Sequence, residues 1–263
     1  MELCLLALDL DGTACNDQGR LGEGTKQALA AARAAGHAVA FATGRRDVDM
    51  LPLGEDFRCA DYLVLNNGGK LVRTADGAVL SNTLVDADAA RTLAQRCLQE
   101  DWILHVVSGL YWAVNRRDQG LLDYVEKVGV TPVLFHSPDE LPLTGIEGFM
   151  ATADRGPICR FIDQAQLPLV HVHSEPGCVD IMPGGITKWQ GLSRLAQLLQ
   201  VPVQRVIAAG DYNNDLEMIQ NAGVGVAVQN ALPQVKAAAD YVTPHDNNHD
   251  AVADIVEKFL LHS

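Results

Sequence analysis

The sequence has few basic side chains for its length and no long apolar run. Its 263 residues include 20 lysines and arginines against 33 aspartates and glutamates, which gives a formal net charge of −13. An acidic surface argues against nonspecific binding to nucleic acid or to anionic membranes. No apolar segment in the sequence is long enough to cross a bilayer. We therefore expect a globular protein with neither a nucleic-acid partner nor a membrane partner.

Cysteine pairs at the spacing of a zinc or redox site are absent as well. The six cysteines are scattered without a CxxC pair, which favours free thiols in a reducing cytosol over disulfides or a zinc site. The first apolar run has no basic stretch before it and ends in an aspartate, so we predict a strand rather than a signal peptide. These features together lead us to expect a cytoplasmic protein.

Apolar segments alternate with helical patterns at both ends of the chain. Strands are predicted over 3–8, 37–42, 62–65, 203–209 and 224–228, and helices over 24–35, 187–199, 213–221, 232–238 and 250–261. This alternation predicts an α/β fold with a doubly wound parallel sheet. Residues 82–185 have the pattern of a separate α+β unit of ordinary domain size. We therefore predict a core made of residues 1–81 and 186–263, with an inserted domain at 82–185.

Two carboxylates follow the first predicted strand. Asp9 and Asp11 are spaced i, i+2, so they point the same way while Leu10 points back toward the core. Gly12 then permits a sharp turn. Two like charges this close need a cation or a shared proton, and Mg²⁺ prefers oxygen ligands. The pair therefore indicates a Mg²⁺ site at the carboxyl end of a strand, where open α/β sheets bind ligands.

Polar residues follow three further segments of the predicted core. Thr43 and Gly44 come after the second strand, and Lys188 lies in the first turn of the helix that returns to the core. The run Gly210-Asp211-Tyr212-Asn213-Asn214-Asp215 follows another apolar strand. Phosphoryl transfer requires groups of these kinds: a nucleophile, a metal, and donors that bind the phosphoryl oxygens.

The order of these segments resembles that of the haloacid dehalogenase superfamily of aspartate-nucleophile phosphatases. DLDGT at 9–13, TGR at 43–45, Lys188 and GDYNND at 210–215 are similar to its four signature motifs. The insertion between the second and third motifs resembles the α/β cap of the Cof-type branch. The chain departs from the usual pattern at Ala14-Cys15, Trp189 and Ala251, none of which removes a catalytic group.

The resemblance implies a role for each matching residue. Asp9 would be the nucleophile that forms an aspartyl-phosphate, and Asp11 would protonate the leaving group and then activate water. The implied phosphate-binding residues are Thr43, Gly44, Lys188 and Asn214. The implied Mg²⁺ ligands are Asp9, Asp11 through its backbone carbonyl, and Asp211, while Asp215 would orient Lys188 or a metal-bound water.

These roles predict a Mg²⁺-dependent phosphatase for a small phosphate ester, with a sugar phosphate as the class that the family most often handles. Two alternatives stay open. A phosphomutase or phosphotransferase would replace the attacking water by a sugar hydroxyl, and a non-catalytic phosphate-binding regulator would share the fold without the reaction. The intact acids and lysine favour an enzyme. The chain itself is expected to be a monomer or a homodimer.

Several other residues carry weaker signals. His171 and His173 share one face of a predicted strand, but without a third ligand at a telling spacing a solvated strand is favoured over a metal site. The stretch 245–249 is expected to cap the last helix. Cys15 has no basic neighbour in the sequence that would lower its pKa, so we expect it to be a bystander.

Overall fold

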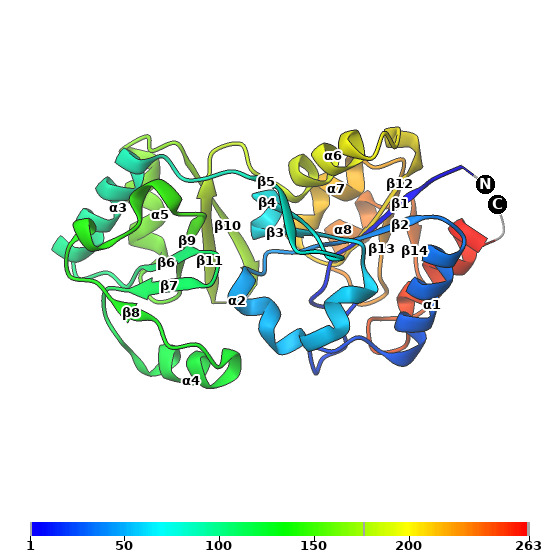
Figure 1. Ribbon diagram of the computed structural model, residues 1–263, viewed down its shortest axis with the longest axis horizontal. Coiled ribbons are helices and arrows are strands. Elements are labelled where there is room, and N and C mark those ends of the chain that lie inside the picture. The colour runs from blue at the N-terminus through cyan, green and yellow to red at the C-terminus, as the bar shows by residue number, and fades with distance from the viewer. Residues whose placement is uncertain (1, 176, 262–263) are drawn as a thin grey trace. The chain divides into compact units, whose positions relative to one another are not determined.

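The chain forms two compact units, each described here by itself. The computed structural model describes residues 2–175 and 177–261 (Figure 1). The first unit contains Met1–Thr43, Leu53–Ser81 and Thr187–Ser263, and the second contains Gly44–Pro52 and Asn82–Ile186. The chain therefore passes between the units four times, whereas a single insertion would require two passages.

The sheet of the first unit is parallel over most of its width. Its strands lie in the order β14-β13-β12-β1-β2-β3-β4-β5, and within the described residues β4 runs antiparallel to β3. They are β1 (Leu5–Leu8), β2 (Ala38–Ala42), β3 (Tyr62–Leu65), β4 (Lys70–Arg73), β5 (Ala78–Asn82), β12 (Val206–Gly210), β13 (Val224–Ala227) and β14 (Tyr241–Val242). The strand order reverses between β1 and β12, which is where doubly wound sheets bind ligands. The predicted fold class is confirmed.

Helices cover both faces of this sheet. They are α1 (Glu23–Ala34), α6 (Lys188–Leu198), α7 (Leu216–Asn221), α8 (Pro233–Ala238) and α9 (Ala251–Val256). Leu5 and Ala7 of β1 pack with Leu192 and Leu195 of α6. Because strand side chains alternate, the equally buried Leu6 faces the opposite side. On that side α1 packs against β2 and α9. Burial on both faces explains the nearly continuous apolar run that preceded Asp9 in the sequence.

The second unit has an antiparallel sheet with one parallel edge strand. The order is β10-β11-β9-β6-β7-β8, with β8 parallel to β7. The strands are β6 (His105–Ser108), β7 (Tyr111–Val114), β8 (Val133–Leu134), β9 (Gly148–Ala151), β10 (Leu169–Glu175) and β11 (Cys178–Pro183). The helices are α2 (Asp47–Met50), α3 (Ala87–Gln99), α4 (Gln119–Val128) and α5 (Arg155–Gln164). Ala113 packs with α3 and α5, whereas its neighbour Trp112 packs with α4 on the opposite face.

The short segment that contains α2 is tied to α4 by a buried polar cluster. Arg46 places its Nε 2.5 Å and its Nη2 3.0 Å from the carboxylate oxygens of Asp49, and Nη2 donates to the Tyr124 hydroxyl at 3.1 Å. The Tyr124 hydroxyl in turn donates to Asp49. Burial acts to lower the pKa of Arg46, but the Asp49 carboxylate outweighs this effect and raises the pKa, so the guanidinium stays charged. The sequence analysis did not anticipate that this segment groups with the second unit.

The start of α3 provides a test of how that helix is capped. Asp86 accepts hydrogen bonds from the N–H groups of Asp88 at 3.1 Å and Ala89 at 2.9 Å. Asp86→Ala should therefore lower the free energy of unfolding by about 1 kcal/mol, as N-cap removal does. Asp88→Ala is the matched control, because it removes only a first-turn charge and should cost less, about 0.3 kcal/mol. Urea unfolding measures both, and equal losses would contradict the assignment of the cap.

Candidate active site

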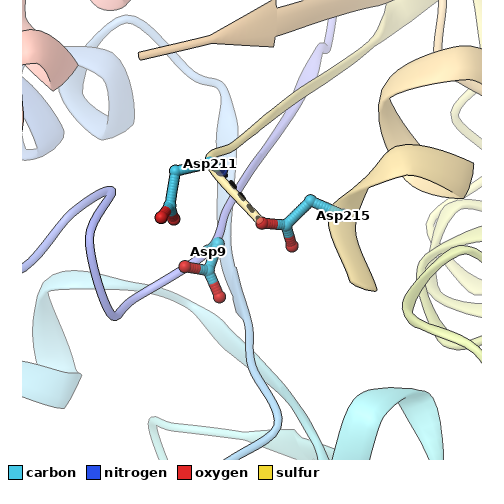
Figure 2. A group of neighbouring side chains, drawn as sticks. All are labelled: Asp9, Asp211 and Asp215. Atoms are coloured by element: carbon cyan, nitrogen blue, oxygen red, sulfur yellow. Dashed lines mark hydrogen bonds between the residues drawn. The ribbon is translucent and has the colours of Figure 1, made fainter. Parts of the chain in front are cut away.

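Asp9 and Asp211 lie at the carboxyl ends of two neighbouring strands. Leu8 of β1 is paired with Ala209 of β12, and the Asp9 N–H donates to the Ala209 carbonyl at 2.9 Å. Each aspartate follows its strand directly, so the pairing brings the two side chains to the same edge of the sheet. Asp9 is only 5% exposed there. Figure 2 shows its carboxylate facing those of Asp211 and Asp215.

Lys188 joins two of these carboxylates. Its Nζ lies 2.5 Å from Oδ1 of Asp9 and 2.6 Å from Oδ1 of Asp215. The lysine side chain is 1% exposed and that of Asp215 is 0% exposed, so the contacts are made away from solvent. Charge-assisted hydrogen bonds of this length are strong, and in a buried site they fix the positions of their partners.

The position of Lys188 follows from the way in which α6 begins. Thr187 is the N-cap, and its hydroxyl accepts a hydrogen bond from the Gln190 N–H at 3.2 Å. The turn after β3 packs closely on this cap, because a Cβ added to Gly68 would lie 2.0 Å from the Thr187 carbonyl oxygen. Gly68 also has a φ of 104°, which side chains rarely adopt. A glycine is therefore required at Gly68 for α6 to start where it does.

Asp215 also organises the backbone after β12. Its Oδ2 accepts hydrogen bonds from the N–H groups of Asp211 and Tyr212, each at 3.0 Å. With its Oδ1 bonded to Lys188, both carboxylate oxygens of Asp215 are engaged. The side chain thereby links the lysine to the loop that carries Asp211.

The charges of this cluster act on one another strongly. Burial raises the pKa of Asp9 well above its ordinary value, the Lys188 ammonium lowers it, and the carboxylates of Asp215 and Asp211 raise it again. Burial likewise raises the pKa of Asp211 to about 6, with a further contribution from Asp215. Burial acts to lower the pKa of Lys188, but the carboxylates of Asp215 and Asp9 outweigh it, so the pKa is raised and the lysine stays charged.

The same carboxylates could hold a metal ion. Among the described residues, Asp9, Asp211 and Asp215 form a group in which one ligand oxygen of each lies within 4.8 Å of the others. Because both oxygens of Asp215 are already engaged, Asp9 and Asp211 are the better metal ligands. An all-oxygen set suits a hard cation such as Mg²⁺, and a cation would oppose the repulsion that raises the carboxylate pKa values. The residues present therefore fit the ion that the sequence suggested.

Thr13 and Gly12 support Asp211, a role that the sequence analysis did not give to either residue. The Thr13 hydroxyl donates to Oδ1 of Asp211 at 2.8 Å. Gly12 has a φ of 82°, and a Cβ there would lie 2.6 Å from Oδ2 of Asp211. The glycine and threonine that follow Asp11 thus orient a carboxylate nearly two hundred residues away. Their position directly after the acidic pair was the available signal.

The remaining residues of the proposed site are placed less directly. Asp11 is exposed and lies two residues beyond Asp9. Thr43 is 1% exposed at the end of β2, and its backbone bonds to Val64 and Asn67. The amide of Asn214 donates to Oδ1 of Asn67 at 3.0 Å. Gly44 groups with the second unit, so the structure does not place it relative to the carboxylates.

A protein-family model for haloacid dehalogenase-like hydrolases matches residues 6–256 of the chain. The chain belongs to this family. It is 31% identical over 270 residues, 98% of each chain, to Bacillus subtilis YxeH, whose name gives phosphatase as a provisional activity. It is 30% identical to a protein of Yersinia pseudotuberculosis named HMP-PP phosphatase, over 88% of this chain and 86% of that protein. The family and these relatives make this hydrolase a phosphatase.

Solved structures show the same fold. A haloacid dehalogenase-like hydrolase from Bacteroides thetaiotaomicron has a TM-score of 0.86 and 24% identity, and the match covers 97% of this chain and 99% of that one. A structure described as the HAD subclass IIB sugar phosphatase BT4131 has a TM-score of 0.82 and 22% identity, over 97% and 98% of the two chains. At these identities the likeness extends to the fold.

The structure also bears on two weaker features of the sequence, the histidine pair at 171 and 173 and the stretch 245–249. His171 bonds to Asp163 at 3.0 Å, and the only possible metal-binding group among the described residues is the one at Asp9. The expectation that 245–249 caps the last helix holds for one backbone contact only, in which the Ala251 N–H donates to the Asp246 carbonyl at 3.2 Å. The N-cap of α9 is Asp250, which makes no side-chain bond to that helix and instead accepts one from the Thr25 N–H in α1 at 3.1 Å.

No helix in the described part of the hydrolase has the length and apolar character needed to span a membrane.

The raised pKa of Asp211 predicts how the stability of the hydrolase should respond to added Mg²⁺ at different pH values. Without metal, a carboxyl whose pKa is raised to about 6 contributes stability below its ordinary value and loses that contribution as the pH rises through about 6. Mg²⁺ needs the ionised form, so saturating Mg²⁺ should raise Tm by several degrees at about pH 7.5 and much less at about pH 5. Thermal unfolding with and without the ion measures this.

Asp211→Asn is the matched control for this experiment. It removes the titrating carboxyl group but keeps the shape of the side chain, so the difference between the Tm shifts at the two pH values should largely disappear. An equal Tm shift at both pH values in the unmodified hydrolase would contradict the assignment of Asp211 as a ligand.

Proposed function

We propose that the chain is a Mg²⁺-dependent phosphatase that hydrolyses a small phosphorylated metabolite through an aspartyl-phosphate at Asp9. The observation that carries the proposal is the buried contact of Lys188 with both Asp9 and Asp215 beside Asp211. It supports a site with a carboxylate nucleophile, a cation to bind a phosphoryl oxygen, and an oxygen cluster for a metal.

The reaction can be written with the chain's own side chains. A carboxylate oxygen of Asp9 attacks phosphorus, the bond to the leaving oxygen breaks, and Asp11 gives that oxygen its proton. Asp11, now ionised, then takes a proton from the water that attacks the phosphorus of the aspartyl-phosphate. This second step releases inorganic phosphate, restores the Asp9 carboxylate and leaves Asp11 protonated again. Asp11 is exposed, which leaves it accessible to the leaving group and to water.

The neighbouring residues bind the phosphoryl oxygens in this proposal. Lys188 offers a fixed positive charge, because Asp9 and Asp215 hold its ammonium group in place. Thr43, the Gly44 N–H and the amide of Asn214 add hydrogen-bond donors. Asn67 supports the last of these, since its Oδ1 already orients the Asn214 amide.

Mg²⁺ would be held by Asp9, Asp211 and the backbone carbonyl of Asp11. When bound, it would supply positive charge that offsets the repulsion among the carboxylates and between them and the phosphate. Thr13 and Asp215 hold Asp211 and its loop in position for this role.

We propose a sugar phosphate as the substrate class. It is supported by the family resemblance and by the fold shared with a structure described as a sugar phosphatase. We further propose that residues 1–81 and 186–263 perform the chemistry in the cytoplasm, while the inserted domain at 82–185 selects the substrate. A screen of phosphorylated metabolites, including sugar phosphates and organic pyrophosphates, tests the class. Preference for pyrophosphates would contradict it.

Asp9→Asn tests the nucleophile. An amide is a poor nucleophile for phosphorus, so kcat should fall by about a thousandfold or more while the fold is retained. Phosphate release from a good substrate measures the loss of kcat. Borohydride, added to a quenched reaction to trap the aspartyl-phosphate, should label Asp9 in the wild-type protein and leave the Asp9→Asn protein unlabelled.

Asp76→Asn is a suitable control for this substitution. Asp76 is an exposed carboxylate whose ion pair is with Arg73 in the same hairpin, so its neutralisation should leave kcat unchanged. Substantial turnover by the Asp9→Asn protein would refute the covalent role of Asp9.

A further inference from the structure

The loop that follows Asp11 is held in place by two asparagines from distant parts of the chain. Asn230, in the turn after β13, donates from its Nδ2 to the carbonyl of Gly12 at 2.7 Å. Asn247, in the segment before α9, donates from its Nδ2 to the carbonyl of Cys15 at 3.0 Å. The two carbonyls lie at the beginning and the end of the stretch 12–15, which directly follows Asp11.

The two asparagines are also bonded to each other. The backbone N–H of Asn247 donates to Oδ1 of Asn230 at 3.1 Å, so both ends of the Asn230 amide are engaged. Asn247 is 8% exposed, and its Nδ2 donates a second bond to Asp17 at 3.1 Å. Asn248 adds a bond from the Asp17 N–H to its Oδ1 at 3.0 Å. We call the two bonded side chains, Asn230 and Asn247, the clamp; together they contact the loop from Gly12 to Asp17.

The clamp controls the backbone on which Asp11 is carried. Before Asp11, the Asp9 N–H is fixed to β12 through the Ala209 carbonyl. After it, the Gly12 carbonyl is fixed by Asn230, and the Asp11 backbone pairs with Cys15, whose carbonyl is fixed by Asn247. The backbone is therefore fixed by hydrogen bonds both before and after Asp11.

The chemistry of the contacts explains why amides serve here. A backbone carbonyl only accepts hydrogen bonds, so its partner must be a donor. The Asn230 side chain must also accept from the Asn247 N–H, which a lysine could not do. An aspartate would keep the acceptor but would place a carboxylate oxygen against the Gly12 or Cys15 carbonyl.

We propose that Asn230 and Asn247 are positioning residues for the proton transfer by Asp11. The proposal rests on the proposed function, in which Asp11 protonates the leaving oxygen. Neither asparagine contacts the reacting atoms. Each acts through the backbone of the loop, and the clamp keeps the Asp11 carboxyl within reach of the leaving group.

The test compares two substrates that differ in their need for a proton. An alkyl phosphate leaves as an alkoxide and needs general-acid assistance, whereas p-nitrophenyl phosphate leaves as a stable phenolate and needs little. Asn230→Asp and Asn247→Asp should lower kcat/KM for the alkyl phosphate by about tenfold to a hundredfold, and for the aryl phosphate by no more than about threefold. The ratio kcat/KM is the suitable measure, because it excludes the later hydrolysis of the aspartyl-phosphate.

Three further proteins complete the experiment: Asn221→Ala, Asp11→Asn, and Asp11→Asn combined with Asn247→Asp. Asn221→Ala removes an exposed amide whose bond is to the Glu217 carbonyl of its own helix, so it should change neither value. In an Asp11→Asn background, Asn247→Asp should cause no further loss that depends on the leaving group, as expected if it acts through Asp11. Thermal unfolding checks that each protein is folded. If Asn247→Asp does not fold, Asn230→Asp carries the test, because Asn230 is at an exposed position.

The outcomes separate this proposal from the proposed function. Equal losses on both substrates, or a leaving-group-dependent loss that persists in the Asp11→Asn background, would overturn the positioning role while the phosphatase activity stands. An unmodified protein that hydrolyses neither substrate nor any phosphate ester of the metabolite screen would overturn the proposed function and this proposal together.

Discussion

One buried ammonium group makes the gathering of carboxylates at this sheet edge possible. Asp9, Asp211 and Asp215 would together carry three negative charges in a site with little access to water, and Lys188 neutralises one of them. Removing Lys188 from this buried group should be strongly destabilising, since the carboxylates would lose their compensating charge. The excess of negative charge that is left adds to the effect of burial in raising the pKa of Asp211, and it favours a divalent cation at this site.

The rest of the first unit can be understood as support for that arrangement. The parallel pairing of β1 with β12 brings Asp9 and Asp211 to one edge, and the Thr187 cap sets the first turn of α6, on which Lys188 lies. Gly68 lets the turn after β3 press against that cap without a steric clash. These supports come from residues outside the charged cluster, so the charged groups are held by the framework and not by their mutual attraction alone.

The fold, and the meeting of Asp9 and Asp211 at one edge of the sheet, could be predicted from the sequence because both depend on local patterns. Buried strands appear as apolar runs, and residues directly after Leu8 and Gly210 must lie at strand ends whatever the remaining details. The contacts that escaped prediction join residues far apart in the chain through side chains without periodicity. The bond from Asn247 to Cys15 spans 232 residues, and the association of Arg46 with Tyr124 spans 78. The residues next to Asn247 and to Arg46 in the sequence do not indicate which distant residue each one contacts.

The association of Arg46 and Asp49 with Tyr124 has a consequence for protein engineering. A chimaera that exchanges only 82–185 for the corresponding domain of a relative would give the resident Arg46–Asp49 pair a foreign α4. If the new helix lacked a tyrosine at the matching position, the buried guanidinium would lose the hydroxyl to which its Nη2 donates. Modular exchange of this domain should therefore carry the nine residues of Gly44–Pro52 along with it, although they lie outside the insertion in sequence.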